Sequence, residues 1–122
     1  MAEREWLIVG TVPREDVPVL FGRGHVENGC LLMDGGQAFS LVRGTPALIA
    51  SAHAVCTTPG EGKIMLLLAG DTGRGTGSRR LYRFLETLLT ERSFSGITFH
   101  YLYPDVDAQN RILMAVEELR RP

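Results

Sequence analysis

The chain has 122 residues and a formal net charge of −1, with 44% hydrophobic and 22% charged residues. These values are typical of one compact domain, which we place over residues 1–122. The balanced charge argues against a basic nucleic-acid surface, so we expect no nucleic-acid partner. The N-terminus is charged and no apolar run approaches membrane-spanning length, so we expect no membrane partner and a cytoplasmic protein.

The first half of the chain contains short apolar runs broken by turn residues. Residues 6–12 predict a first strand, and residues 14–21 a short helix that Pro18 weakens. Residues 30–33 and 39–42 predict two further short strands. Thr45 as N-cap and Pro46 at the first helical position predict a helix from there to about Cys56. A loop follows over residues 57–62.

The second half has the clearer pattern. Residues 63–69 are apolar on both faces, which predicts a central strand of a parallel sheet. Beyond the glycine-rich segment an amphipathic stripe predicts a helix, formed by Leu81, Phe84, Leu85, Leu88 and Leu89. Alternation over residues 97–103 predicts a strand buried on one face, with a helix packed over its aromatic side chains. Asp105 or Asp107 is expected to cap a last helix.

The element order therefore predicts an α/β fold. We expect a single compact domain with a mostly parallel sheet, helices on both faces and a C-terminal βαβα unit. The first forty residues are expected to add antiparallel strands.

The segment from Asp71 to Ser78 carries the strongest functional signal. It joins an apolar strand to a helix through a glycine-rich turn, an arrangement that lets backbone N–H groups point at a phosphate or carboxylate. Arginines cluster on and after the turn, and planar guanidinium groups suit anion recognition. We therefore predict the ligand-binding positions Gly73, Arg74, Gly75, Thr76, Gly77, Ser78 and Arg79. The ligand or cofactor is left open.

The spacing Asp-x-Gly-x-Gly-x-Gly after an apolar strand resembles the first motif of Rossmann-like S-adenosylmethionine-dependent methyltransferases. That resemblance implies cofactor contacts at Asp71, Gly73, Gly75 and Gly77. It extends no further than residues 71–77. The chain departs from the family pattern beyond them, because only one further strand and helix pattern follow and Asp105 lies too late to hold a ribose.

Other glycine-loop fingerprints fail at single residues. A P-loop requires Lys-Ser/Thr where Thr76-Gly77 stand. A dinucleotide turn requires glycine where Arg80 stands. The Asp-Thr-Gly at residues 71–73 also matches aspartic proteases, but those are β-rich and need two such aspartates. We identify no family from these motifs.

Three aspartates end apolar runs, namely Asp34, Asp71 and Asp105. If their strands are parallel neighbours, all three gather at the carboxyl edge of the sheet, where open α/β sheets bind ligands. Asp71 and Asp34 are our candidate catalytic residues, as a general base or as ligands of a cation, a ribose hydroxyl or an amine. The alternative is that each aspartate serves only its turn or cap.

The cysteines and histidines carry little signal. Cys30 and Cys56 lie among apolar residues without C-x-x-C spacing, which predicts reduced, buried thiols, although spacing alone leaves one disulfide open. His25 with Cys30 and His53 with Cys56 could supply four zinc ligands, but neither pair has zinc-finger spacing. We predict no metal site.

Two functions remain open. In the first, the chain binds a small anionic ligand, phosphate-bearing or nucleotide-like, at residues 71–79, as a binding domain or an enzyme. In the second, it is a non-catalytic structural or assembly module whose glycine loop serves only the turn. The exposed alternation over residues 97–103 and the small size of the domain predict a homo-oligomer.

Overall fold

The computed structural model describes residues 5–14, 16–40, 48–49 and 63–120. No helix in these ranges is long and apolar enough to span a membrane. The elements follow one another as β1 (Glu5–Val12), β2 (Leu20–Gly22), β3 (Gly24–Glu27), β4 (Cys30–Met33), β5 (Ala38–Ser40), β6 (Lys63–Gly70), α2 (Thr76–Glu91), β7 (Gly96–His100) and α3 (Val106–Arg120).

Sheet A is mixed and has the strand order β2-β6-β1-β7. Strand β1 pairs in parallel with both β6 and β7, and β2 pairs antiparallel with β6. Successive side chains of β1 enter different cores, because strand side chains alternate between faces: Leu7 belongs to one core and Ile8 to the other. The prediction of a buried central strand over residues 63–69 is confirmed.

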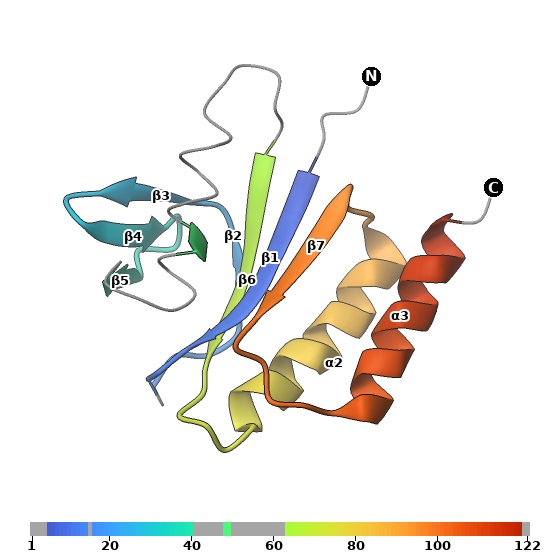
Figure 1. Cartoon of the computed structure of the whole chain (residues 1–122). Helices are drawn as coiled ribbons and strands as arrows, with labels where there is room; N and C mark the ends of the chain where they lie inside the picture. Colours follow the sequence, from blue (N-terminus) through green and yellow to red (C-terminus); the bar gives the residue numbers. More distant parts are fainter. Residues whose placement is uncertain (1–4, 15, 41–47, 50–62, 121–122) are drawn as a thin grey trace.

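Both described helices lie on the same face of sheet A (Figure 1). The predicted stripe of α2 packs into this core through Leu81, Leu85, Leu88 and Leu89, while Phe84 stays partly exposed. Helix α3 adds Ala108 and Ile112 to the same core. The Oδ1 atom of Asp105 accepts a hydrogen bond from the Ala108 amide at 3.0 Å, which confirms the predicted cap of the last helix.

Among the described residues a second sheet, and not a pair of helices like α2 and α3, covers the opposite face. Sheet B has the antiparallel order β3-β4-β5 and lies across sheet A from the two helices (Figure 1). Its residues Leu31, Met33 and Phe39 share a core with Ile8 and Leu66 of sheet A. The expected mostly parallel sheet with helices on both faces is therefore wrong.

Local turn chemistry explains this difference. Asn28 and Gly29 join β3 to β4 with φ angles of 51° and 75°, the left-handed pair that a tight hairpin requires. Strands of three or four residues then cover this face of sheet A. The predicted short helix over residues 14–21 is also wrong, because Leu20–Gly22 extends to pair with β6.

Two predictions fall largely outside the described residues. Of the helix expected from Thr45 to about Cys56, only Leu48 and Ile49 are described, and their backbone is helical. Ile49 is fully buried in the core between the sheets. The strand expected over residues 39–42 is β5 as far as Ser40, and residues 41 and 42 are not described.

Truncation of Leu31 tests whether sheet B is an integral layer. Leu31 is fully buried between the sheets, whereas its ladder partner Val26 is exposed. We expect Leu31→Ala to lower the free energy of unfolding by about 3 kcal/mol, because it leaves a cavity, and Val26→Ala by less than about 1 kcal/mol. Urea unfolding measures both, and equal small losses would contradict the packing of this layer.

Candidate functional site at the carboxyl edge of sheet A

The parallel strands β1, β6 and β7 end at one edge of sheet A, and the chain leaves this edge toward both faces. After β1 it continues to β2 and sheet B, whereas after β6 it enters α2 on the helical face (Figure 1). Such a point is where open α/β sheets bind ligands. A groove of about 740 Å³ lies here, lined by Thr11, Pro13, Asp71, Thr72, Gly73, Ser78, Tyr101, Leu102, Tyr103 and Pro104.

The Asp71 carboxylate organises the turn between β6 and α2. Its Oδ1 atom accepts hydrogen bonds from the amides of Gly73, Arg74 and Gly75 at 2.9, 3.0 and 3.1 Å. Its Oδ2 atom accepts from the Ser78 amide and the Ser78 hydroxyl, both at 3.0 Å. The Asp71 carboxylate therefore already accepts hydrogen bonds from four of the amides that were predicted to bind a ligand.

The glycines of this turn have structural reasons of their own. Gly75 is the N-cap of α2 and has a φ angle of 87°, a left-handed conformation that side chains disfavour. Gly77 packs directly on the carbonyl oxygen of Gly70, where a Cβ atom would collide. This contact holds the first turn of α2 against the end of β6, because only a glycine leaves room for it.

Ser78 lies inside the first turn of α2 rather than at its cap. Its hydroxyl donates to Asp71 Oδ2 and accepts from the Tyr103 amide at 2.8 Å. Gly75 and not Ser78 is the N-cap of α2, and Asp71 accepts from the first-turn amide of Ser78 from outside the helix. Ser78 instead connects the glycine loop to the segment that follows β7.

The pKa of Asp71 reflects opposing effects. Burial raises it, and the hydrogen bonds from Ser78, Gly75 and Gly73 lower it by a larger total, so the pKa lies below the ordinary value of 3.8. Asp71 is therefore a carboxylate at neutral pH. Its five hydrogen bonds are donated by residues of the turn and of the first turn of α2, which suits a positioning role more directly than proton abstraction.

The segment after β7 forms the aromatic wall of the groove. Thr11 Oγ1 donates to the Tyr101 carbonyl oxygen, and the Tyr82 hydroxyl donates to the Tyr103 carbonyl oxygen at 3.3 Å. A Cβ atom at position 75 would lie 3.1 Å from the Tyr103 ring, which is a tight contact. Tyr101 and Tyr103 remain 69% and 51% exposed. Sequence reasoning missed both as site residues, because their alternation with polar neighbours indicated a strand packed under a helix.

The predicted binding residues therefore divide into two groups. The amides of Gly73, Arg74, Gly75 and Ser78 are engaged by Asp71. The Arg79 amide donates to Gly75 within the turn. Within the described residues the amides of Thr76 and Gly77 donate to no acceptor. In the same residues no carboxylate forms an ion pair with the guanidinium groups of Arg74 and Arg79. Both arginine side chains are exposed.

The three aspartates do not gather at this edge. Asp34 lies in the turn after β4 in sheet B, is exposed, and does not line the groove. Asp105 caps α3. Asp34 is separated from the other two because β4 belongs to the antiparallel sheet B, whereas β6 and β7 both belong to sheet A. No cluster of potential metal ligands occurs among the described residues, and His53 and Cys56 lie outside them.

Comparison with protein-family models, with curated proteins and with solved structures finds no match to this chain. The site is therefore interpreted from its own geometry.

Replacement of Asp71 by asparagine tests its place in the turn. The folded-state pKa lies below the ordinary value, so the carboxylate stabilises the fold above that value and loses this effect as pH falls through the folded pKa. We expect Asp71→Asn to lower the free energy of unfolding by about 1–2 kcal/mol at pH 7, with the deficit shrinking below about pH 4. Urea unfolding from neutral to acidic pH measures it.

The control is Asp34→Asn, which removes the same charge from an exposed turn and should change stability by less than about 0.5 kcal/mol. A deficit for Asp71→Asn that is unchanged at low pH, or one no larger than that of the control, would contradict the assigned role.

Proposed function

We propose that this protein binds a small ligand with an anionic group in the groove at the carboxyl edge of sheet A. The observation that carries the proposal is the position of the groove, where the connections after β1 and β6 depart toward opposite faces. Residues in or directly after all three parallel strands line the groove, so the central strands of sheet A position the site.

The charges around the groove favour an anion held by side chains. Arg74 directly follows the lining residue Gly73, and Arg79 lies one turn into α2. The amides of Thr76 and Gly77 and the positive end of the helix dipole add to this field. The exposed tyrosines supply flat apolar surface for the rest of the ligand, which suits a ring-bearing molecule.

Asp71 shapes the loop in this proposal and does not meet the ligand's anion. A ligand anion at the amides of Gly73, Arg74, Gly75 and Ser78 would have to displace a carboxylate that already accepts from all four. The anionic group therefore lies outside that ring, toward Arg74. Whether a reaction follows binding is left open, and Asp71 remains the candidate acid–base group within the groove.

A second candidate is the non-catalytic module in which the loop serves only the turn. The hydrogen bonds of Asp71 and the close contact of Gly77 with Gly70 favour it, because both would be needed without any ligand. For either function we propose a cytoplasmic protein, on the sequence evidence of two isolated cysteines.

Thermal unfolding with candidate ligands distinguishes the two functions. The probes are inorganic phosphate, adenine and nicotinamide nucleotides and S-adenosylmethionine, each compared with chloride at equal ionic strength. A ligand at about one hundred times its Kd adds about 2.7 kcal/mol to stability, which raises the Tm by several degrees. We expect at least one probe to do so.

Two variants locate the response. Arg74→Gln and Tyr101→Ala should each weaken binding about ten-fold, since Arg74 is the exposed cation next to the lining residue Gly73 and Tyr101 lines the groove. Arg83→Gln is the matched control, because it makes the same charge change roughly 10 Å farther along α2. No shift from any probe would support the purely structural loop, and a shift that both groove variants leave unchanged would place the ligand elsewhere.

A further inference from the structure

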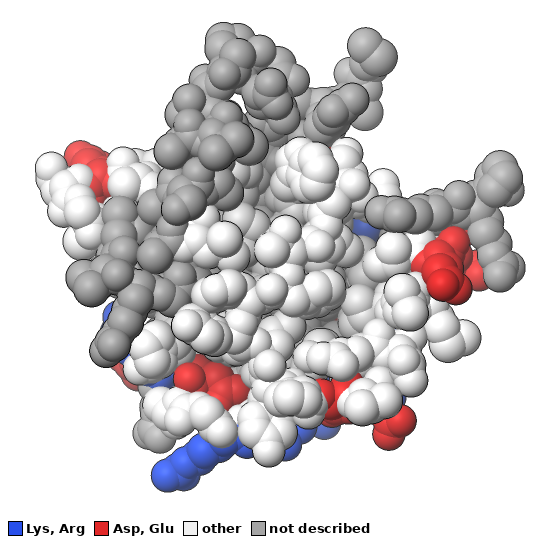
Figure 2. Space-filling model, viewed as in Figure 1, with Lys and Arg blue, Asp and Glu red and all other residues white. Residues whose placement is uncertain are grey.

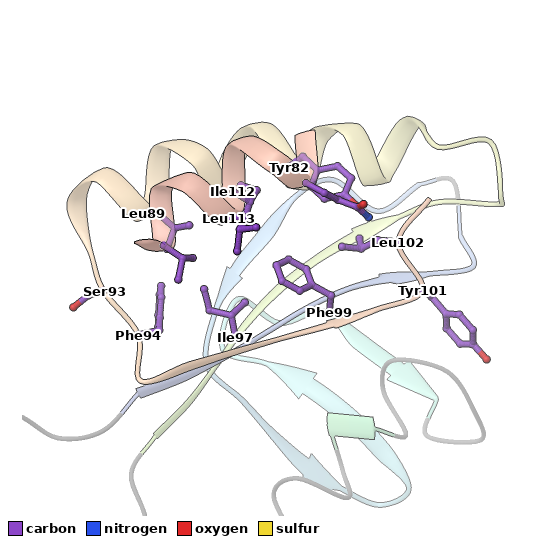
Figure 3. A pocket seen from close by; sticks show the side chains of 12 residues that line it. Tyr82, Leu89, Ser93, Phe94, Ile97, Phe99, Tyr101, Leu102, Ile112 and Leu113 are labelled. Atoms are coloured by element: carbon purple, nitrogen blue, oxygen red, sulfur yellow. The ribbon is translucent and has the colours of Figure 1, made fainter. Parts of the chain in front are cut away.

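A second hollow, the apolar groove, lies between β7, α2 and α3. It measures about 770 Å³, and its lining carries no formal charge, being formed by Tyr82, Leu89, Ser93, Phe94, Ile97, Phe99, Tyr101, Leu102, Gln109, Ile112, Leu113 and Val116. Ile97 and Phe99 rise from β7 toward Leu113 on α3, and Tyr101 lies at one end of the groove (Figure 3). Phe99 is 45% exposed and Leu113 57% exposed.

The outer edge of β7 borders this groove. Strand β7 is the last strand of sheet A, and no other described strand pairs with its outer edge. Sheet edges exposed to solvent are usually protected by lysine, proline or a bulge, because unpaired N–H and C=O groups recruit other strands. The sequence of β7, Gly-Ile-Thr-Phe-His, contains none of the protecting residues.

We propose that a second copy of this chain covers β7 and α3. The two β7 strands would pair antiparallel about a two-fold axis normal to the sheet, which joins both copies of sheet A into one sheet. The same axis places each α3 beside its counterpart, so that Leu113 of one copy enters the apolar groove of the other. The interface is self-complementary, as a two-fold dimer requires.

The exposed apolar area supports a second copy as the occupant. Phe99, Tyr101, Val106 and Leu113 together expose on the order of 400 Å² of apolar side chain per copy. A standard interface buries about 800 Å² per partner, of which somewhat more than half is apolar. Figure 2 shows this side of the molecule with few charged atoms in its middle and acidic and basic residues toward its margin, the usual pattern of an apolar centre and a polar rim.

The test is the mass of the intact chain in solution, measured by light scattering after size exclusion from about 1 to about 200 µM. We expect a mass twice the 13.4 kDa of one chain at high concentration. Leu113→Glu should raise the dimer dissociation constant at least ten-fold. Met114→Glu is the matched control, because Met114 is 68% exposed but does not line the groove, and it should leave the dimer intact.

A cysteine introduced at the centre of β7 tests the proposed antiparallel pairing of the two strands. In a background with Cys30→Ser and Cys56→Ser, Thr98→Cys should form a covalent dimer on oxidation, because the two-fold axis brings residue 98 near its counterpart. Thr87→Cys, on an exposed part of α2, should not. A monomer at every concentration would overturn the proposal, whether or not the chain then binds other strands. So would a dimer that Leu113→Glu leaves intact. Because Tyr101 lines both grooves, the mass measurements are made without ligand, and neither result decides whether the ligand groove is occupied.

Discussion

The Asp71 carboxylate is the interaction on which the carboxyl edge of this fold depends. A strand that enters a helix through a tight turn leaves several amides without partners, and burying them unpaired is costly. Here one side chain accepts from four of those amides and from the Ser78 hydroxyl. Ser78 then accepts from the Tyr103 amide, so the end of β6, the start of α2 and the segment after β7 form one connected unit.

In the proposed function, that unit determines where the ligand would bind. An internal carboxylate already occupies the position that a phosphate takes in many glycine-rich loops, so recognition falls to groups outside the ring of amides. The available groups are the guanidinium of Arg74, the first-turn amides of Thr76 and Gly77, and the tyrosine wall. The apolar groove beside β7 has a different chemistry and serves the proposed self-association.

The sequence predicted the parts of the fold in which a single periodicity dominates. The doubly apolar residues 63–69 and the stripe from Leu81 to Leu89 are found as β6 and α2 because burial alone decides them. The expectation of antiparallel strands in the first forty residues is confirmed by sheet B, but their assembly into a separate second sheet was not predicted, because strands this short show no clear period and the Asn28-Gly29 hairpin signal was not used. An apolar central strand predicts cover on both faces and does not say whether helices or strands provide it.

The position of the glycine-rich turn was predicted, whereas its internal hydrogen bonds were not. The glycine turn does lie at the carboxyl edge of a parallel strand, as its order in the sequence requires. The hydrogen bonds from the loop amides to Asp71 depend on left-handed glycines and on the close approach of Gly77 to Gly70. No local sequence pattern encodes either feature. The separation of Asp34 from Asp71 follows from the membership of β4 in a separate sheet, because strand pairing decides which turns share an edge.

The most direct test of the central claim is a pH titration of the ¹⁵N chemical shifts of Gly73, Arg74, Gly75 and Ser78 in the intact chain. All four amides donate to one carboxylate, so the account predicts that they move together, with a common midpoint below the ordinary aspartate value of 3.8. The exposed Gly35 amide should not share this transition. Four amides that titrate independently, or with a midpoint at or above 3.8, would contradict the account.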